Sequence, residues 1–152
     1  MTKPTILILA IAYLASILIV GIFGMQVMSF NNVNYIASIT LTEQSLEFSQ
    51  DKESLNVIFV EKEQDGYIEY RVKLNFKSPV TISVNPIVVA KDPTQDPTDR
   101  TLSISVHEST AGLVENDGVS TNYTINKKGT ATVTFSANDN SGKKMVLKIV
   151  AI

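Results

Sequence analysis

The sequence of 152 residues has no cysteine, no tryptophan and a single histidine, His107. Without cysteine, disulfide frameworks, cysteine nucleophiles, cysteine-based zinc sites and lipidation on a thiol are all excluded. One imidazole cannot build a zinc site, which usually needs three or four protein ligands, so we interpret His107 as a surface residue. Basic residues are not in excess either, since 13 Lys and Arg stand against 15 Asp and Glu. We therefore expect no nucleic-acid partner.

Charged residues are scarce, at 18% of the chain against roughly 25% in an average globular protein, and the deficit is concentrated near the N-terminus. Residues 4–42 contain no Asp, Glu, Lys, Arg or His. Within them Ile6–Met25 is an apolar run of 20 residues, which is long enough for a helix to cross a hydrocarbon core of roughly 30 Å. We predict an N-terminal transmembrane anchor at 1–28 that contacts the lipid bilayer through Ile6–Met25, a short connector at 29–34 and one domain at 35–152.

The flanks of the apolar run bear on cleavage and orientation. A signal peptide has an apolar core of only about 7–15 residues and a small-residue cleavage site, whereas this run is longer and Phe23 interrupts the sequence that would have to be the site. We favour an uncleaved anchor, and a cleaved signal stays open as the alternative. Lys3 precedes the run, and residues 26–40 contain no Lys or Arg. The positive-inside rule then places the N-terminus in the cytoplasm and the C-terminal domain outside it, as a single-pass protein of the cell membrane.

Beyond residue 34 the hydrophobic period becomes two. In the segment 130–137, Ala131, Val133 and Phe135 alternate with hydroxyl residues, as the half-buried strands of a sheet require. The same alternation predicts seven strands, at 35–41, 55–60, 67–76, 80–84, 101–107, 130–137 and 145–150. Asp65-Gly66 is typical of a hairpin turn, and the proline-containing segment 91–100 is expected to be a loop. The pattern predicts an all-β fold, and specifically a β-sandwich.

Candidate binding sites are few. Asp92, Asp96 and Asp99 fall in the 91–100 loop, and carboxylates spaced in a loop can supply some of the six to eight oxygens that calcium prefers. Their spacing is not that of an EF-hand, so we favour a solvated loop and leave calcium open; Asp139 receives the same interpretation. No phosphate-binding glycine loop, carboxylate pair or triad order is visible, so we predict no catalytic, cofactor-binding or metal-ligating residue and no enzyme activity.

Two lysine pairs and one sequon complete the candidates. Lys127-Lys128 and Lys143-Lys144 are interpreted as solvated turn lysines, since exposed lysine is the rule. Asn122-Tyr123-Thr124 is a single N-glycosylation triplet, which arises easily by chance.

Several segments of the C-terminal two-thirds resemble a known family. They are Ile39–Leu41 with Ser45–Phe48, the proline-containing loop before Leu102–Ser105, Glu108–Gly118 and Lys128–Thr134. Together they resemble group 2 bacterial immunoglobulin-like domains, which occur in bacterial surface proteins and intimin-like adhesins. The Lys128-Gly129-Thr130-Ala131 piece is the most specific part, whereas the tryptophan that the family often carries in the strand matching Leu102–Val106 is absent.

The resemblance implies an immunoglobulin-like β-sandwich that is not an enzyme and that serves as a spacer, an adhesive module or a partner-binding unit. We therefore expect a structural or binding role in adhesion, in envelope attachment or as an accessory subunit of a membrane complex, with a protein or cell-envelope partner. The alternative is a surface-filament subunit of the archaellin or pilin kind, in which N-terminal helices bundle and β domains coat the outside. An enzyme with an unusual site is the third hypothesis.

Overall fold

The computed structural model describes residues 8–13, 33–118 and 120–152. Residues 8–13 are helical, and residues 34–152 form one compact unit. Most of the predicted anchor and connector lies outside the described residues. Within the described part of the chain, no helix is long and apolar enough to span a membrane.

Strands make up most of the compact unit. In chain order they are β1 (Ile36–Thr40), β2 (Leu46–Phe48), β3 (Ile58–Gln64), β4 (Tyr67–Leu74), β5 (Val80–Val84), β6 (Ile87–Ala90), β7 (Leu102–Glu108), β8 (Val114–Glu115), β9 (Asn122–Ile125), β10 (Gly129–Ala137) and β11 (Lys144–Ala151). A short 3-10 helix, η1 (Glu43–Ser45), precedes β2, and one helical turn, α2 (Lys52–Leu55), precedes β3. The prediction of an all-β fold is confirmed for the described residues.

The strand predictions hold with two differences. The predicted strand at 55–60 begins later, at Ile58, because residues 52–55 form α2 instead. Asp51 caps this turn by accepting a hydrogen bond from the backbone N of Ser54 at 3.1 Å, as N-cap carboxylates do. The structure also adds four short strands, β2, β6, β8 and β9, to the seven predicted. They have two to four residues each, too few for an alternating pattern to distinguish them.

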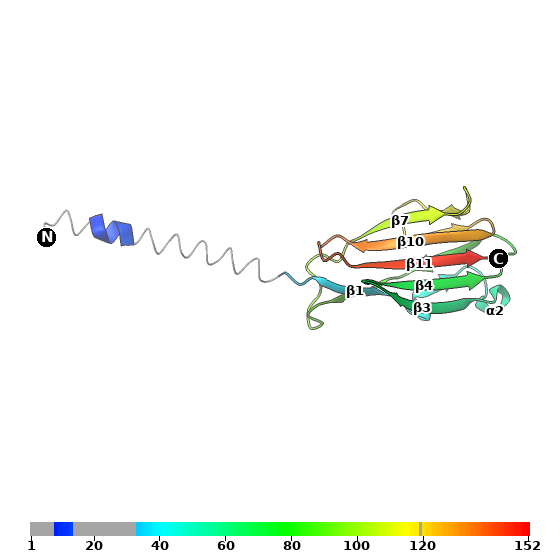
Figure 1. Cartoon of the computed structure of the whole chain (residues 1–152), viewed down its shortest axis with the longest axis horizontal. Coiled ribbons are helices and arrows are strands. Elements are labelled where there is room, and N and C mark those ends of the chain that lie inside the picture. Colours follow the sequence, from blue (N-terminus) through cyan, green and yellow to red (C-terminus); the bar gives the residue numbers. More distant parts are fainter. Residues whose placement is uncertain (1–7, 14–32, 119) are drawn as a thin grey trace. The chain divides into compact units, whose positions relative to one another are not determined.

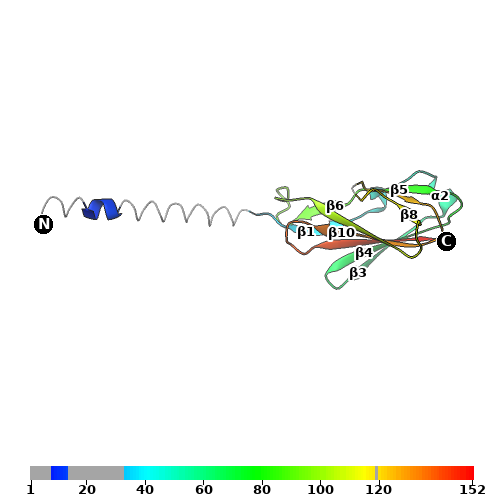
Figure 2. The same cartoon turned by 90° about the horizontal axis from the view of Figure 1, so that it is seen from above.

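The strands of the described residues form three sheets, and Figure 1 shows the largest of them face-on. The largest has five strands in the order β3-β4-β11-β10-β7, in which β4 and β11 are parallel and the other neighbours antiparallel. A second sheet has the order β2-β5-β9-β8, and β1 pairs with β6 alone. Seen from above, β3, β4 and β10 lie in one layer, and β5, β6 and β8 lie in another (Figure 2).

One hydrophobic core fills the space between the layers. Alternation places Tyr70, Val72 and Leu74 of β4 inside, each at most 1% exposed. Tyr123 of β9 packs edge-on against Phe135 of β10, with 6.5 Å between the ring centroids. Full burial of each large apolar side chain contributes about 1.5–3 kcal/mol, so the alternation that the sequence shows is what holds the sheets together.

Two glycines occupy backbone conformations that favour glycine. Gly66 has φ +84° in the turn between β3 and β4, which confirms the predicted hairpin. Gly129 has φ +145° at the start of β10, where a Cβ atom would overlap the Leu113 side chain and lie 2.9 Å from Ser109 Oγ. The loop after β7 therefore packs directly on the Gly129 backbone.

Candidate binding face

The outward-pointing residues of the five-stranded sheet form one continuous surface, which we call the outer face. Strand register assigns them, because they alternate with core residues and lie beside outward residues of the neighbouring strands. On β10 and β7 they are Thr130, Thr132, Thr134, Ser136, Ser103, Ser105 and His107. On β3, β4 and β11 they are Ile58, Val60, Lys62, Gln64, Tyr67, Glu69, Arg71, Lys73, Lys144, Val146, Lys148 and Val150.

Cations dominate the charge of the outer face. Lys148 lies directly opposite Arg71 across the parallel β4–β11 pair. Arg71 Nη2 is 3.4 Å from Glu69 Oε1, which is the one carboxylate of the face. Lys144 Nζ lies 4.6 Å from the centroid of the Tyr67 ring, a cation–π contact that holds its charge in place. The face therefore presents a cationic centre bordered by hydroxyl groups.

Charge is segregated between the outer face and the remainder of the domain. The outer face has five basic side chains and one acidic side chain, whereas the remaining domain has seven basic and fourteen acidic side chains. A chain with an overall net charge of −2 thus has one strongly positive side. Such a patch attracts anions over about a Debye length, roughly 10 Å at 0.1 M salt.

The outward side of the four-stranded sheet has a different character. Its positions in the described strands include two glutamates, Glu47 and Glu115, and no cation. Its hydroxyl groups bond to each other or to amides: the Thr81 and Thr124 hydroxyls lie 2.9 Å apart, and Ser83 Oγ donates to an asparagine oxygen at 2.7 Å.

The hydroxyl groups along β10 on the outer face are free by comparison. Among the described residues, the side chains of Thr132, Thr134 and Ser136 have no hydrogen-bond partner in the protein. Each hydroxyl carries one donor and two acceptor lone pairs. The outer face can therefore offer a partner both positive charge and a row of hydrogen-bonding groups.

His107 lies on the outer face, in register with Thr132 of β10. Its side chain is exposed, which confirms the predicted surface position. No group of three or more His, Cys, Asp or Glu side chains in the described residues is placed to hold a metal ion.

The loop that carries Asp92, Asp96 and Asp99 is organised around an amide. Asn34 Nδ2 faces three backbone carbonyl oxygens, those of Asp92, Gln95 and Asp96, at 3.1, 3.3 and 3.2 Å. Asn34 Oδ1 accepts a hydrogen bond from the backbone N of Asp92 at 3.0 Å. An asparagine amide thus occupies the centre of the loop, where carbonyl oxygens converge.

The carboxylates of this loop serve local turns. The Thr94 hydroxyl donates to Asp92 Oδ1 at 2.6 Å and lowers the pKa of that carboxyl. The Thr101 hydroxyl does the same for Asp99 at 2.7 Å. Asp96 lies 3.7 Å from Arg100, both of them exposed. The three carboxylates therefore stabilise the loop individually and do not converge on one point.

Asp139 differs from its predicted role as a solvated turn residue. It is 8% exposed, and its Oδ2 accepts a hydrogen bond from the backbone N of Ile36 at 2.6 Å. Burial alone would raise the pKa of Asp139, but this bond and those from Ser141 outweigh burial and lower the pKa. The carboxylate joins the β10–β11 turn to the start of β1.

A second carboxylate, Glu108, organises the loop after β7. Its two oxygens accept hydrogen bonds from the backbone N of Val114 and of Gly112, both at 2.9 Å, and these bonds lower the pKa of Glu108. Lys127 Nζ reaches the same loop and donates to the Ala111 carbonyl at 3.0 Å. Lys127 is therefore a loop-bracing residue and not merely a solvated lysine.

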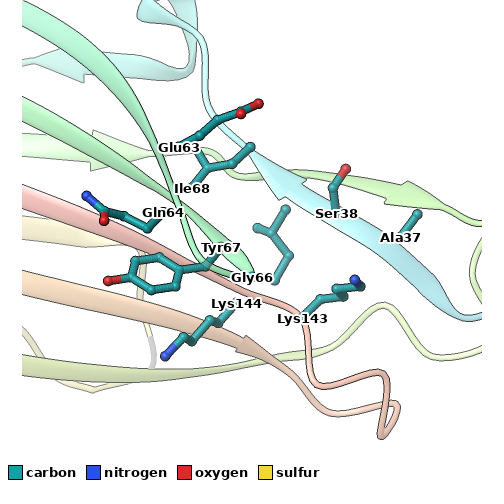
Figure 3. A pocket seen from close by; sticks show the side chains of 10 residues that line it. Ala37, Ser38, Glu63, Gln64, Gly66, Tyr67, Ile68, Lys143 and Lys144 are labelled. Atoms are coloured by element: carbon teal, nitrogen blue, oxygen red, sulfur yellow. The ribbon is translucent and has the colours of Figure 1, made fainter.

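The other lysine pair borders a shallow pocket of about 240 Å³ between β1 and the β3–β4 hairpin (Figure 3). Lys143 and Lys144 line it together with Glu63, Tyr67 and Ile68. Acidic, basic and apolar side chains are mixed here, and no salt bridge or nucleophile–base pair links them among the described residues. This pocket offers no reaction centre.

Comparison of the chain with protein-family models, with curated proteins and with solved structures gave no match.

Proposed function

We propose that the chain is a single-pass membrane protein, anchored through Ile6–Met25, that presents an immunoglobulin-like β-sandwich outside the cytoplasm. In this proposal the domain is a binding module, and the outer face of its five-stranded sheet binds an anionic polymer of the cell envelope. The observation that carries the proposal is the outer face itself. It gathers five basic side chains and a row of unpaired hydroxyl groups on one side of an otherwise acidic domain.

The direction of the strands favours an extended partner. The strands β3, β4, β11, β10 and β7 lie side by side, and the outer face runs along their length (Figure 1). Lys144, Lys148 and Lys73 lie in three different rows along this length. A polymer with repeated negative charges can contact several of these rows at once, and multiple weak contacts then add.

The polymer proposal is tested with the full-length chain in detergent on immobilised dextran sulfate, with neutral dextran as the control matrix. We expect retention on dextran sulfate alone, weakening as salt shortens the Debye length. A triple variant, Lys73→Gln, Lys144→Gln and Lys148→Gln, should weaken binding roughly tenfold or more, since each exposed ionic contact contributes up to about 1 kcal/mol.

The matched control for that triple variant removes the same charge elsewhere. Lys77→Gln, Lys91→Gln and Lys128→Gln lie outside the outer face and should leave retention nearly unchanged. Equal losses in both triple variants would mean that net charge alone governs retention. Binding to vesicles of anionic phosphatidylglycerol without binding to dextran sulfate would contradict the polymer proposal in favour of a lipid partner.

The membrane topology has its own test, which is protease protection in intact cells. Added protease should degrade the C-terminal domain while cytoplasmic control proteins survive. A domain that resists protease until the cells are lysed would place it inside and refute this part of the proposal.

A second candidate function is a surface-filament subunit, in which domains of neighbouring copies meet side by side. The observation that favours it is that both outermost strands of the five-stranded sheet, β3 and β7, have no neighbour on one side in the described chain. Negative-stain microscopy of the full-length chain tests this candidate. Fibres would support it, and monodisperse particles at high concentration would end it.

A further inference from the structure

The two edges of the five-stranded sheet, β3 and β7, have no further strand beside them in the described part of the chain. β3 and β7 have seven residues each, and both follow their inner neighbours without a bulge. Natural proteins usually protect such edges with lysine, proline, bulges or a covering segment. β7 has no lysine or proline along its length, and β3 carries charges only in its second half, at Glu61–Glu63, while Ile58–Val60 carry none.

The directions of the two edges make them complementary. The sheet contains three antiparallel junctions and one parallel junction, so β3 and β7 run in opposite directions. A second copy placed alongside in the same orientation therefore brings its β3 antiparallel to β7 of the first. Antiparallel pairing then requires no inversion of either copy, and it keeps the inner and outer faces continuous.

The side chains favour one register. If Phe59 of one copy lies opposite Ile104 of the next, Val57 falls opposite Val106, and these four apolar residues meet on the core side. On the outer face, Ile58 then faces Ser105, and Val60 faces Ser103. The uncharged residues Ile58–Val60 meet Ser103–Ser105, and Glu61 falls opposite Leu102 at the start of β7. If the residue rows of the two copies were instead aligned without a shift along the strands, Glu61 would lie opposite Val106 and Glu63 opposite Ile104.

The β7 edge also has space for this contact. A pocket of about 300 Å³ opens between β7 and β8 and is lined by Ile104, Val106 and Val114, among others. Val106 is 38% exposed, and on the other edge Ile58 and Val60 are 47% and 49% exposed. An added strand whose Phe59 and Val57 point to the core side would cover this pocket and bury apolar surface on both copies.

We propose that copies of this chain pair edge to edge, with β3 of one copy antiparallel to β7 of the next in the register Phe59 opposite Ile104. This pairing deepens the second candidate function and does not rest on polymer binding by the outer face. Each copy is shifted by four residues along the strands relative to its neighbour, about 13 Å at 3.3 Å per residue. The contact joins two different surfaces, so a pair of copies leaves one β3 edge and one β7 edge free to take up further copies.

The chain has no cysteine, so single-cysteine variants report pairing directly. Full-length Val60→Cys and Ser103→Cys proteins are mixed in detergent and oxidised, since directly opposite Cβ atoms in antiparallel strands lie within disulfide reach. We expect the mixed disulfide in excess over both homodimers and over random pairing. Val60→Cys mixed with Glu47→Cys, on the other sheet, controls for collision.

Contrary outcomes of this crosslinking are equally specific. A predominance of Val60 homodimers would replace the proposed contact with a symmetric β3–β3 dimer and overturn it. Stronger crosslinking of Val60→Cys to His107→Cys would overturn the register. Mixed disulfides no more abundant than those of the Glu47→Cys control would overturn the pairing itself, whatever dextran sulfate binding shows.

A second measurement uses charge to block one edge at a time. Val60→Lys and Ser105→Lys lie on exposed outer-face positions, so both should fold, which circular dichroism checks. Each variant alone should sediment as a monomer, because one of its two edges is blocked. Their mixture should form dimers and nothing larger, since one intact β3 and one intact β7 remain. Monomers in the mixture, or oligomers of either variant alone, would refute the pairing.

Discussion

Replacing Asn34 by alanine should destabilise the domain by loosening the loop of residues 92–98. The Asn34 side chain accepts one hydrogen bond, from Asp92 N, and directs Nδ2 at three carbonyl oxygens between 3.1 and 3.3 Å away. Nδ2 has two hydrogens, so the equivalent of three bonds is lost. Water competes at this half-buried site, so each bond contributes about 0.5–1 kcal/mol, and we expect a loss of about 2 kcal/mol.

Asn34→Asp should lower the stability of the domain more than Asn34→Ala does, although aspartate has nearly the same shape as asparagine. It replaces the donor nitrogen by a carboxylate oxygen that faces the carbonyls of Asp92, Gln95 and Asp96. Acceptor oxygens then face acceptor oxygens, and the negative charge of the new carboxylate lies near the carboxylates of the loop. Calcium should leave the unfolding temperature of the wild-type protein unchanged, because an amide nitrogen already occupies the point where these oxygens converge.

Thermal unfolding of the full-length chain in detergent, followed by circular dichroism, measures these effects. A loss of 2 kcal/mol corresponds to a fall in Tm of roughly 8 °C for a domain of this size. Asn85→Ala is the matched control, because Asn85 is exposed and its side chain has no partner among the described residues, so it should change stability by less than about 0.5 kcal/mol. If both Asn34 variants behave like Asn85→Ala, the amide does not organise the loop.

Three further substitutions test other features of the domain. Glu108→Gln should destabilise the domain at neutral pH, since an amide has one acceptor oxygen for the two backbone N–H groups. Folding lowers the pKa of Glu108 below its ordinary 4.5, so the stabilisation by this carboxylate is present above that pH and is lost on acidification. The variant should therefore show a shallower acid dependence of stability in urea unfolding. Tyr123→Phe should leave stability unchanged or raise it by about 1–2 kcal/mol in chemical denaturation. The reason is that the Tyr123 hydroxyl is buried without a partner among the described residues, and burial raises its pKa to about 12. A marked destabilisation would mean that this hydroxyl has a partner. Gly129→Ala should lower stability by about 2 kcal/mol or more, measured by Tm, because the new Cβ would overlap the Leu113 side chain and crowd Ser109 at a positive φ. A neutral result would show that the loop after β7 can move to make room for the added methyl group.

The sequence was sufficient to predict the long strands because their burial is regular. In β10, Ala131, Val133 and Phe135 are fully buried while the residues between them are partly exposed, so the alternation is visible without the structure. The prediction was less successful for β6, Ile87–Ala90, a continuous apolar run with no alternation. It also missed α2, whose signal is one capping aspartate before a single turn.

The candidate binding face could be predicted only in part. Alternation along β4 shows that Arg71 and Lys73 share a face, which needs no knowledge of other strands. That β11 lies parallel beside β4 and sets Lys148 against Arg71 is a long-range pairing, and no local pattern encodes it. The structural role of Asp139 was missed for the same reason, because its hydrogen-bond partner Ile36 lies 103 residues away in sequence.

The separation of charge between the outer face and the remaining surface also makes the domain a permanent electric dipole. Its positive pole lies on the outer face of the five-stranded sheet, and the excess of negative charge is distributed over the remainder of the domain. Near any charged surface at low ionic strength, such a body experiences a torque before it makes contact, so it approaches already oriented. The fold thus selects which side arrives first, and salt shortens the distance over which this selection operates.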